Sequence, residues 1–437
     1  MPACPALLIA SPASRHGKTL VTAGLARMYR RIGFNIRVFK TGPDFLDPIL
    51  LEYASGSSVY SLDLGMVGKN ECHTLLAQAA KDVDLILIEG VMGLFDGMPS
   101  TADLSIAFRI PIVAVISAKS IAQTFAAIAF GLAYFNQDLL FYGVLANQVS
   151  SVRHRQLLQE RLPNELRWLG YVNADTSVAL PERYLGLYQP KDISDLDMRL
   201  ERIADMLALT ELDVLPPPVS FVDPRPVEIL SIDKIITRRH IAIARDAAFS
   251  FIYPANLALL KNMLKAQLHF FSPLANDPLP DGCDTLFIPG GYPELHAQAL
   301  SSNKRSADTI REHIRAEKPI IAECGGMIYL CDAVVDSNDR ITSMLGMLPG
   351  IAKIQDRLIA LGMQQFDTRY GPLRGHTFHY SRFYTKLIPA ATAYQLDNAD
   401  HSGEAIYQYG SIVATYMHMY WPSNPVAASS LLNGEKI

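Results

Sequence analysis

The first half of the chain alternates short apolar runs with longer amphipathic stretches, and this alternation limits its fold more than any other feature. The apolar runs predict buried strands over 6–10, 37–40, 84–90, 110–117 and 141–147. The stretches between them predict helices over 18–32, 69–81, 120–136 and 151–162. Strands that alternate with helices in this way form a parallel sheet with helices on both faces. We therefore expect an N-terminal α/β domain built on a parallel sheet.

A second α/β domain is expected after a proline-rich stretch. Residues 212–238 carry closely spaced prolines and no helical period, which is typical of a linker. Strands are then predicted over 240–246, 268–274, 284–291 and 319–324, and helices over 254–266 and 304–317. The predicted organisation is a first domain over 1–211, a linker over 212–238 and a second domain over 239–437. A chain of 437 residues is long enough for two separate cores.

Charge and cysteine usage exclude several classes of protein. The formal net charge is −4, so there is no basic field to hold a nucleic acid. The most apolar long segment, 110–135, is interrupted by Lys119 and Gln123, so we expect no membrane span. Five scattered cysteines suit a reducing cytosol, and no signal peptide is recognised at the N-terminus. We expect a cytoplasmic protein.

The stretch SPASRHGKT, residues 11–19, resembles the end of a phosphate-binding loop. It follows the strand at 6–10 and opens the helix at 18–32, which is the context that such a loop requires. Gly17, Lys18 and Thr19 match the loop's last three positions, but the glycine that usually opens it is absent. The loop alone leaves open whether this is a nucleotide site or an ordinary helix start.

Carboxylates follow two further strands of the same predicted sheet. Asp44 and Asp47 lie in a turn after the strand at 37–40, and Glu89 and Asp96 flank the loop that follows the next strand along the chain. In an open α/β sheet, ligands bind at the carboxyl ends of the strands. Carboxylates near a polyphosphate act chiefly through magnesium. The set predicts a site for ATP and Mg²⁺.

The second domain contains a candidate thiol nucleophile. In PIIAECGGM, residues 319–327, Cys324 lies between small residues where a strand turns into a helix, which is an arrangement that exposes a nucleophile beside backbone N–H groups. The glycines in FIPGGYPE, residues 287–294, suit an oxyanion site, and His418 can serve as a base for the thiol. Cysteine, oxyanion loop and histidine in this order resemble a class I glutamine amidotransferase. Most such domains carry a glutamate two residues after the histidine, where this chain has Tyr420.

Motifs along the whole chain resemble those of the cobyrinic acid a,c-diamide synthase family. They are the loop SPASRHGKT together with KTGPDFLDP, EGVMGLFDG, LPERYLGL, IARDAAFSFIYPANL, FFSPLAND, PGGYPELHA, AECGGMIYL, RGHTFHYS and YMHMYWPSNP. The resemblance implies a phosphate-loop domain of the dethiobiotin synthetase type fused to a glutaminase. It implies ATP-dependent amidation, with glutamine as nitrogen donor, of the a and c side-chain carboxylates of cobyrinate or hydrogenobyrinate in cobalamin biosynthesis, through an acyl phosphate.

The resemblance also assigns roles to individual residues. In the first domain it implies that Ser14, Gly17, Lys18 and Thr19 bind ATP, and that Thr19 and Glu89 handle the metal. The positions linked to the corrinoid and to carboxylate activation match Asp44, Phe45, Leu46 and Asp96. In the second domain it implies that Cys324 attacks glutamine, that His418 carries the proton, and that the N–H groups of Gly291 and Gly325 hold the oxyanion.

Four positions depart from the family pattern, and other readings stay open. Arg15 and His16 stand where small residues are usual, Tyr184 where the family often has His, and Thr377 where it often has Glu. The alternatives are a paralogue acting on another tetrapyrrole such as sirohydrochlorin, a cobyric acid synthase, or a non-enzymatic phosphate-loop switch. The expected partners are the corrinoid, L-glutamine and ATP. Macrocycles with and without cobalt are both candidate substrates, and a homodimer is one candidate assembly.

Overall fold

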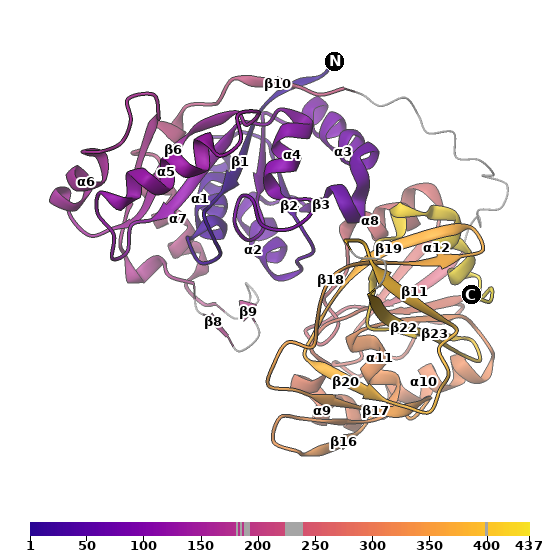
Figure 1. Cartoon of the computed structure of the whole chain (residues 1–437). Helices are drawn as coiled ribbons and strands as arrows, with labels where there is room; N and C mark the ends of the chain where they lie inside the picture. Colours follow the sequence, from indigo (N-terminus) through magenta and orange to yellow (C-terminus); the bar gives the residue numbers. More distant parts are fainter. Residues whose placement is uncertain (181, 184–185, 188–192, 223–238, 398–400) are drawn as a thin grey trace. The chain divides into compact units, whose positions relative to one another are not determined.

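The computed structural model describes residues 1–437 except 181, 184–185, 188–192, 223–238 and 398–400. It separates the chain into two compact units, Met1–Val227 and Glu228–Ile437 (Figure 1). Most of the predicted linker 212–238 falls on residues outside the described ones. Its first part includes the short strand β10 (Pro218–Ser220), which pairs antiparallel with the start of β1 (Ala3–Ala10), so these residues belong to the sheet of the first unit.

The first unit is built on a parallel sheet, as predicted. Its order is β3-β2-β4-β1-β5-β6-β7. The bounds are β3 (Tyr60–Leu62), β2 (Ile36–Thr41), β4 (Leu85–Glu89), β5 (Ile112–Ser117), β6 (Phe141–Val149) and β7 (Trp168–Asn173). Every residue of β4 is buried, as a strand covered on both faces must be. The carboxyl ends of β1, β2 and β4 are neighbours, so the loops that follow them meet at one edge of the sheet.

Helices cover this sheet. They are α1 (Lys18–Arg31), α2 (Leu46–Ser55), α3 (Lys69–Asp82), α4 (Thr101–Phe108), α5 (Thr124–Tyr134), α6 (Val152–Gln159) and α7 (Leu196–Leu207), with short turns η1 (Leu64–Gly68), η2 (Thr176–Val178) and η4 (Glu211–Asp213). A two-stranded ribbon joins β8 (Glu182–Arg183) and β9 (Gly186–Leu187). Helix α1 packs against both α2 and α7, and together they bury one face of the sheet. Helices α2, α4 and α7 and strand β7 were not predicted from the sequence.

The second unit has a mixed sheet in the order β12-β11-β13-β14-β23-β22-β21-β18-β19-β24. Its first strands are parallel: β12 (Gln267–Phe271), β11 (His240–Ala244), β13 (Thr285–Ile288), β14 (Ile320–Glu323) and β23 (Ile412–Thr415). The rest are antiparallel: β22 (Ser402–Tyr409), β21 (Ala391–Gln395), β18 (Ala360–Thr368), β19 (Gly371–His379) and β24 (His418–Met419). A smaller sheet contains β16 (Ile341–Ser343), β15 (Cys331–Val335), β17 (Leu348–Ile354) and β20 (Ser381–Tyr384).

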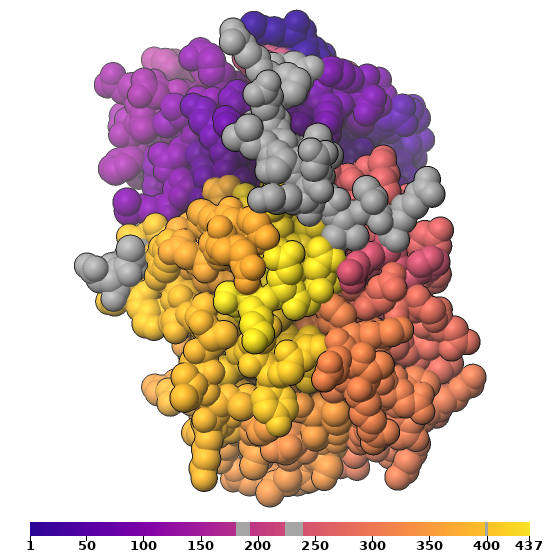
Figure 2. Space-filling model, turned by 90° about the vertical axis from the view of Figure 1, so that its right-hand side faces the viewer, coloured from indigo at the N-terminus to yellow at the C-terminus, as the bar shows by residue number. Residues whose placement is uncertain are grey.

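The helices of the second unit are short. They are α8 (Pro254–Ala258), η6 (Leu259–Met263), η7 (Pro293–His296), α9 (Ala297–Ser302), α10 (Lys304–Arg315), α11 (Gly325–Leu330), η8 (Trp421–Ser423) and α12 (Pro425–Leu432). The predicted helix 254–266 is therefore an α-helical turn followed by a π-helical one. Helix α12 packs against β19 and β14, and Figure 2 shows this yellow C-terminal segment flanked by other parts of the same unit.

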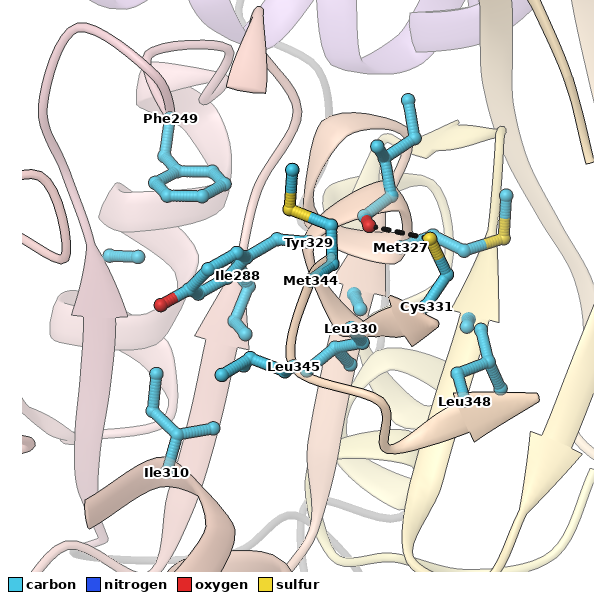
Figure 3. Close-up of a cluster of buried hydrophobic side chains, with 14 of the residues drawn as sticks. Phe249, Ile288, Ile310, Met327, Tyr329, Leu330, Cys331, Met344, Leu345 and Leu348 are labelled. Atoms are coloured by element: carbon cyan, nitrogen blue, oxygen red, sulfur yellow. Dashed lines mark hydrogen bonds between the residues drawn. The ribbon is translucent and has the colours of Figure 1, made fainter. Parts of the chain in front are cut away.

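A dense apolar cluster surrounds α11, the helix that begins directly after Cys324. Met327, Tyr329 and Leu330 of α11 are buried among side chains from several other elements (Figure 3). Cys331, which directly follows the helix, donates its thiol hydrogen to the carbonyl oxygen of Ile328. Close packing of this kind fixes the start of α11 and therefore the backbone of Cys324. Among the described residues, no helix is long and apolar enough to cross a bilayer.

Candidate active sites

The loop between β1 and α1 is shaped as a phosphate-binding loop. Gly17, just before the helix, has φ +91°, and a Cβ at this position would lie 2.2 Å from Asn147 Nδ2. Only glycine suits both the left-handed backbone and the close approach. The Lys18 ammonium is buried and donates to Ser11 Oγ (2.7 Å) and to the carbonyl oxygens of Met92 (2.6 Å) and Ala13 (3.3 Å). The lysine is thus held at the centre of the loop.

Arg15 and His16, the two bulky residues in the loop, have different roles. Arg15 has φ +67°, the left-handed conformation in which glycine costs least, and its exposed side chain borders the cavity described below. His16 Nδ1 accepts a hydrogen bond from the Ser117 N–H (2.9 Å), and its carbonyl oxygen accepts one from Asn147 Nδ2 (3.0 Å). His16 therefore ties the loop to the ends of β5 and β6.

Behind the loop lies a compact group of charged side chains. The Thr19 hydroxyl donates to Glu89 Oε1 (2.6 Å). Lys40, at the end of β2, places its ammonium 3.1 Å from the same oxygen, 2.9 Å from Asp47 Oδ2 and 3.7 Å from Asp44 Oδ2. Lys40 was not among the site residues predicted from the sequence, although a lysine at the carboxyl end of a buried strand is the signal that could have identified it.

The protonation of this group follows from burial and mutual attraction. Burial lowers the pKa of Lys18, assisted by Lys40, to about 8. Burial also disfavours the charge on Lys40, but Asp47, Glu89 and Asp44 outweigh it and raise the pKa of Lys40 above its usual range. Burial raises the pKa of Glu89, and burial with the neighbouring Asp47 raises that of Asp44 to about 8. Such paired, perturbed groups are typical of functional sites.

The loop and the charged group border one cavity of about 790 Å³ within the first unit. Its lining includes Ser14, Gly17, Lys18, Thr19, Asp44 and Glu89 of the predicted site residues, and also Lys40 and Asp47. The described lining does not include Phe45, Leu46 or Asp96. Phe45 directly precedes α2 and Leu46 begins it. The exposed Asp96 accepts a hydrogen bond from the Gly93 N–H (2.8 Å) in the loop after β4. Tyr184 lies outside the described residues.

Thr19 and Glu89 fit the magnesium role expected of them. Glu89 Oε2 is buried and has no hydrogen-bond partner among the described residues, so a ligand position is open beside the Thr19 hydroxyl. Within the same described residues, no group of three or more His, Cys, Asp or Glu could hold a metal ion. When Mg²⁺ takes its other ligands from phosphates and water, the protein needs to supply only one carboxylate and one hydroxyl.

In the second unit, Cys324 occupies a strained turn between β14 and α11. Its φ of +44° is unusual for a residue other than glycine, as is typical of a nucleophile in the turn between strand and helix. Its N–H donates to the Thr415 carbonyl oxygen (2.7 Å), which fixes the turn. A Cβ on Gly325 would lie 2.9 Å from the Gly291 nitrogen, so the two glycines predicted to hold the oxyanion are neighbours.

His418 and Cys324 converge on Gly290. A Cβ at Gly290 would lie 2.2 Å from His418 Cε1 and 3.3 Å from Cys324 Cβ, so the missing side chain leaves room for both. Burial, with a contribution from Glu294, raises the pKa of the Cys324 thiol. Burial, followed by His376 and His379, holds the pKa of His418 well below its usual range. At neutral pH the pair is therefore a neutral thiol and a neutral imidazole.

Thr377, the departure noted in the sequence, lies in a buried polar group. Its hydroxyl donates to Glu404 Oε1 (2.9 Å), and His379 Nε2 lies 2.9 Å from the same oxygen. His379 Nδ1 lies 2.8 Å from the Ser381 carbonyl oxygen, and its ring stacks on Tyr416 with centroids 3.8 Å apart. Glu404, which lies on β22, thus places a carboxylate beside position 377. No sequence signal pointed to Glu404.

Comparison with known proteins identifies a domain family for each part of the chain. Residues 7–187 match the family described as the CobQ/CobB/MinD/ParA nucleotide binding domain, and residues 240–426 match the CobB/CobQ-like glutamine amidotransferase domain. The chain is 52% identical over 429 residues to a hydrogenobyrinate a,c-diamide synthase of Stutzerimonas stutzeri, covering 98% of each. It is 50% identical to that of Pseudomonas aeruginosa, covering 98% of this chain and 97% of the relative.

A third relative carries a related name. A cobyrinate a,c-diamide synthase of Herminiimonas arsenicoxydans is 45% identical over 433 residues, covering 98% of this chain and 97% of the relative. Matches that cover 98% of this chain extend through both units. The chain belongs to the family of hydrogenobyrinate and cobyrinate a,c-diamide synthases.

Proposed function

We propose that this protein is a ligase that converts the a and c side-chain carboxylates of hydrogenobyrinate or cobyrinate into amides, with ATP and glutamine as co-substrates. The observation that carries the proposal is the presence of two complementary sites in one chain. The first unit has a phosphate loop backed by Lys40, Glu89 and Thr19. The second has a cysteine in a nucleophile turn beside His418. An ATP site and a glutaminase site are what such an amidation requires.

The first unit would activate the carboxylate. A carboxylate oxygen of the macrocycle attacks the γ-phosphorus of ATP, the bond from that phosphorus to the β-γ bridging oxygen breaks, and ADP leaves. Lys18 neutralises charge on the transferred group, since phosphoryl transfer depends on positioning and charge stabilisation. Thr19 and Glu89 would hold Mg²⁺, which supplies further charge neutralisation when bound. Lys40 holds Glu89 and Asp47 in place.

The second unit would release ammonia. The Cys324 thiol gives its proton to His418 as the sulfur attacks the carboxamide carbon of glutamine. The N–H groups of Gly291 and Gly325 would hold the oxygen that becomes negative. His418 then returns the proton to the departing nitrogen, ammonia leaves, and water hydrolyses the thioester to glutamate. Ammonia attacks the acyl phosphate in turn, and phosphate leaves as the amide forms.

The choice of macrocycle is a separate question with a direct experiment. Purified protein is given ATP, Mg²⁺ and glutamine labelled in its amide nitrogen, with hydrogenobyrinate, cobyrinate or sirohydrochlorin as acceptor. Mass spectrometry then counts the labelled nitrogens in each product. The proposal expects two labelled amides on hydrogenobyrinate or cobyrinate, and ADP formed in equal number. Turnover of sirohydrochlorin alone would instead assign the protein to the alternative tetrapyrrole reaction.

A further inference from the structure

The ring of His418 is paired with a second histidine. Strand β24 runs antiparallel to β19, and the register places His376 directly opposite His418. The two rings stack, with centroids 4.9 Å apart and an angle of 18° between their planes. The strands approach so closely that a Cβ on Gly375 would lie 2.1 Å from the His418 carbonyl oxygen. One face of the His418 ring is therefore covered by a side chain on a fixed neighbouring strand.

The other sides of the His418 ring are also enclosed. The Phe251 ring lies with its centroid 6.0 Å from that of His418, and Phe251 is anchored by its N–H to the Gly290 carbonyl oxygen (3.0 Å). Gly290 itself faces His418 Cε1. The ring is thus confined between His376, Phe251 and the oxyanion loop, and only 1% of His418 is exposed.

His376 is itself held in place. Its side chain is 1% exposed, and Nδ1 forms a hydrogen bond with the Tyr253 hydroxyl. The Tyr253 ring also packs edge-on against Tyr420, with centroids 5.4 Å apart and planes at 83°. Tyr420 occupies the position two residues after His418, where most class I domains have an orienting glutamate. In this chain, that place belongs to an aromatic group that includes His376.

We infer that His376 is a positioning residue for the glutaminase reaction, which holds the His418 imidazole in its working orientation by stacking and is itself fixed by Tyr253. The inference rests on the proposed glutaminase role of Cys324 and His418. Packing of this kind limits rotation of the ring, as a hydrogen bond to a carboxylate does in other domains. Displacement of a reacting group by about 1 Å is enough to lower a rate about a hundredfold.

The charge of His376 suits this role. When His418 accepts the Cys324 proton, it becomes a buried cation. Burial lowers the pKa of His376 to about 3, so its ring stays neutral and places no second full positive charge beside the new cation.

The test compares His376→Ala, His376→Phe and His376→Gln in the full chain. Three quantities are measured: kcat and KM for glutamine hydrolysis, the rate at which 6-diazo-5-oxo-L-norleucine labels Cys324, and the rate of amidation with ammonia. For His376→Ala we expect kcat to fall about a hundredfold and KM to change by less than about threefold, with slower Cys324 labelling and an unchanged ammonia-dependent rate. His376→Phe, which keeps the stack, should recover about tenfold of the loss, whereas His376→Gln should not.

The control is a substitution in a second pair of stacked histidines, far from Cys324 in the sequence. His269→Ala removes one ring of another stacked histidine pair, His240 and His269, whose centroids lie 5.2 Å apart, and should leave every rate unchanged. A wild-type kcat in the His376→Ala variant would overturn the inference. A kcat for His376→Gln as high as that for His376→Phe would also overturn it. If the His376→Ala variant does not fold, the other two variants decide. A higher kcat for His376→Phe than for His376→Gln supports the inference, and any other order overturns it. Glutaminase activity that survives Cys324→Ser would instead overturn the proposed function.

Discussion

The Thr19 hydroxyl donates a hydrogen bond of 2.6 Å to Glu89 Oε1, although 70 residues of sequence separate the two. The contact exists because β1 and β4 are neighbours in the parallel sheet, so the helix that follows β1 begins beside the last residue of β4. The same oxygen faces the Lys40 ammonium, which arrives at the end of β2. The ends of three strands thus meet at one cavity, where we propose that phosphate and metal bind.

Glu89→Gln should disable the ATP-dependent reaction while sparing the glutaminase. The amide keeps the size of the side chain but removes the charge that the metal requires, so the rate of ADP formation should fall at least about a hundredfold. Titration of that rate against Mg²⁺ provides the measurement. The control is Glu201→Gln, which alters a surface ion pair with Arg27 and Arg31. An unchanged rate and Mg²⁺ dependence would remove Glu89 from the metal site.

Lys40→Met should destabilise the first unit in a pH-dependent way. Lys40 is 3% exposed and balances Asp44, Asp47 and Glu89, so its loss leaves buried carboxylates facing one another. We expect a loss of about 3 kcal/mol in the free energy of unfolding at pH 8. The loss should shrink toward pH 5.5, because the carboxylates of the variant can then bind protons and relieve the repulsion. Urea unfolding at both pH values measures the difference in free energy between wild type and variant, with substitution of the exposed Lys69 by Met as the control. A difference that does not change with pH would contradict the prediction.

ATP binding should take up a proton above about pH 8. The pKa of Lys18 is lowered to about 8 by burial and by Lys40, and triphosphate oxygens beside the ammonium would raise it again. Affinity should therefore be flat below pH 7.5 and fall by up to about tenfold per pH unit above pH 8. Calorimetry in buffers of different ionisation enthalpy should show proton uptake at pH 9 and little at pH 7. Lys18→Met should abolish the uptake; uptake that persists in this variant would assign it to another group.

The sequence predicted the parts of these sites that are set by strand order. A parallel sheet brings the ends of its strands together, so the loop at 11–19 and the carboxylates after two other strands had to meet. The nucleophile turn at Cys324 was predictable because small residues follow it. The role of Lys40 could not be predicted, because a single lysine in an apolar strand gives no sign of the three carboxylates that surround it in the fold. The pairings of His376 with His418 and of Thr377 with Glu404 depend on antiparallel register, which no local pattern specifies.

Cys324 should be a position at which glycine is more stable than alanine. At φ +44°, a residue with a Cβ lowers the free energy of unfolding by about 1–2 kcal/mol relative to glycine. Glycine loses part of this advantage because its unfolded chain has more conformational entropy. We expect Cys324→Gly to exceed Cys324→Ala by about 1 kcal/mol in the stability of the second unit. Cys72, inside α3, should show the opposite order, since glycine is unfavourable within a helix. Denaturant unfolding of the four variants measures both differences, and the same order at both positions would contradict the strained turn.

Cys324→Ser provides the most direct test of the account, because it separates the two sites in a single chain. The variant is assayed for amidation of hydrogenobyrinate or cobyrinate with ATP, first with glutamine and then with ammonia as nitrogen donor. We predict that glutamine-dependent amidation is lost, since the serine hydroxyl is a far weaker nucleophile than the thiol in this turn, and that ammonia-dependent amidation stays at the wild-type rate. Loss of both reactions, or survival of the glutamine-dependent one, would contradict the division of labour between the units.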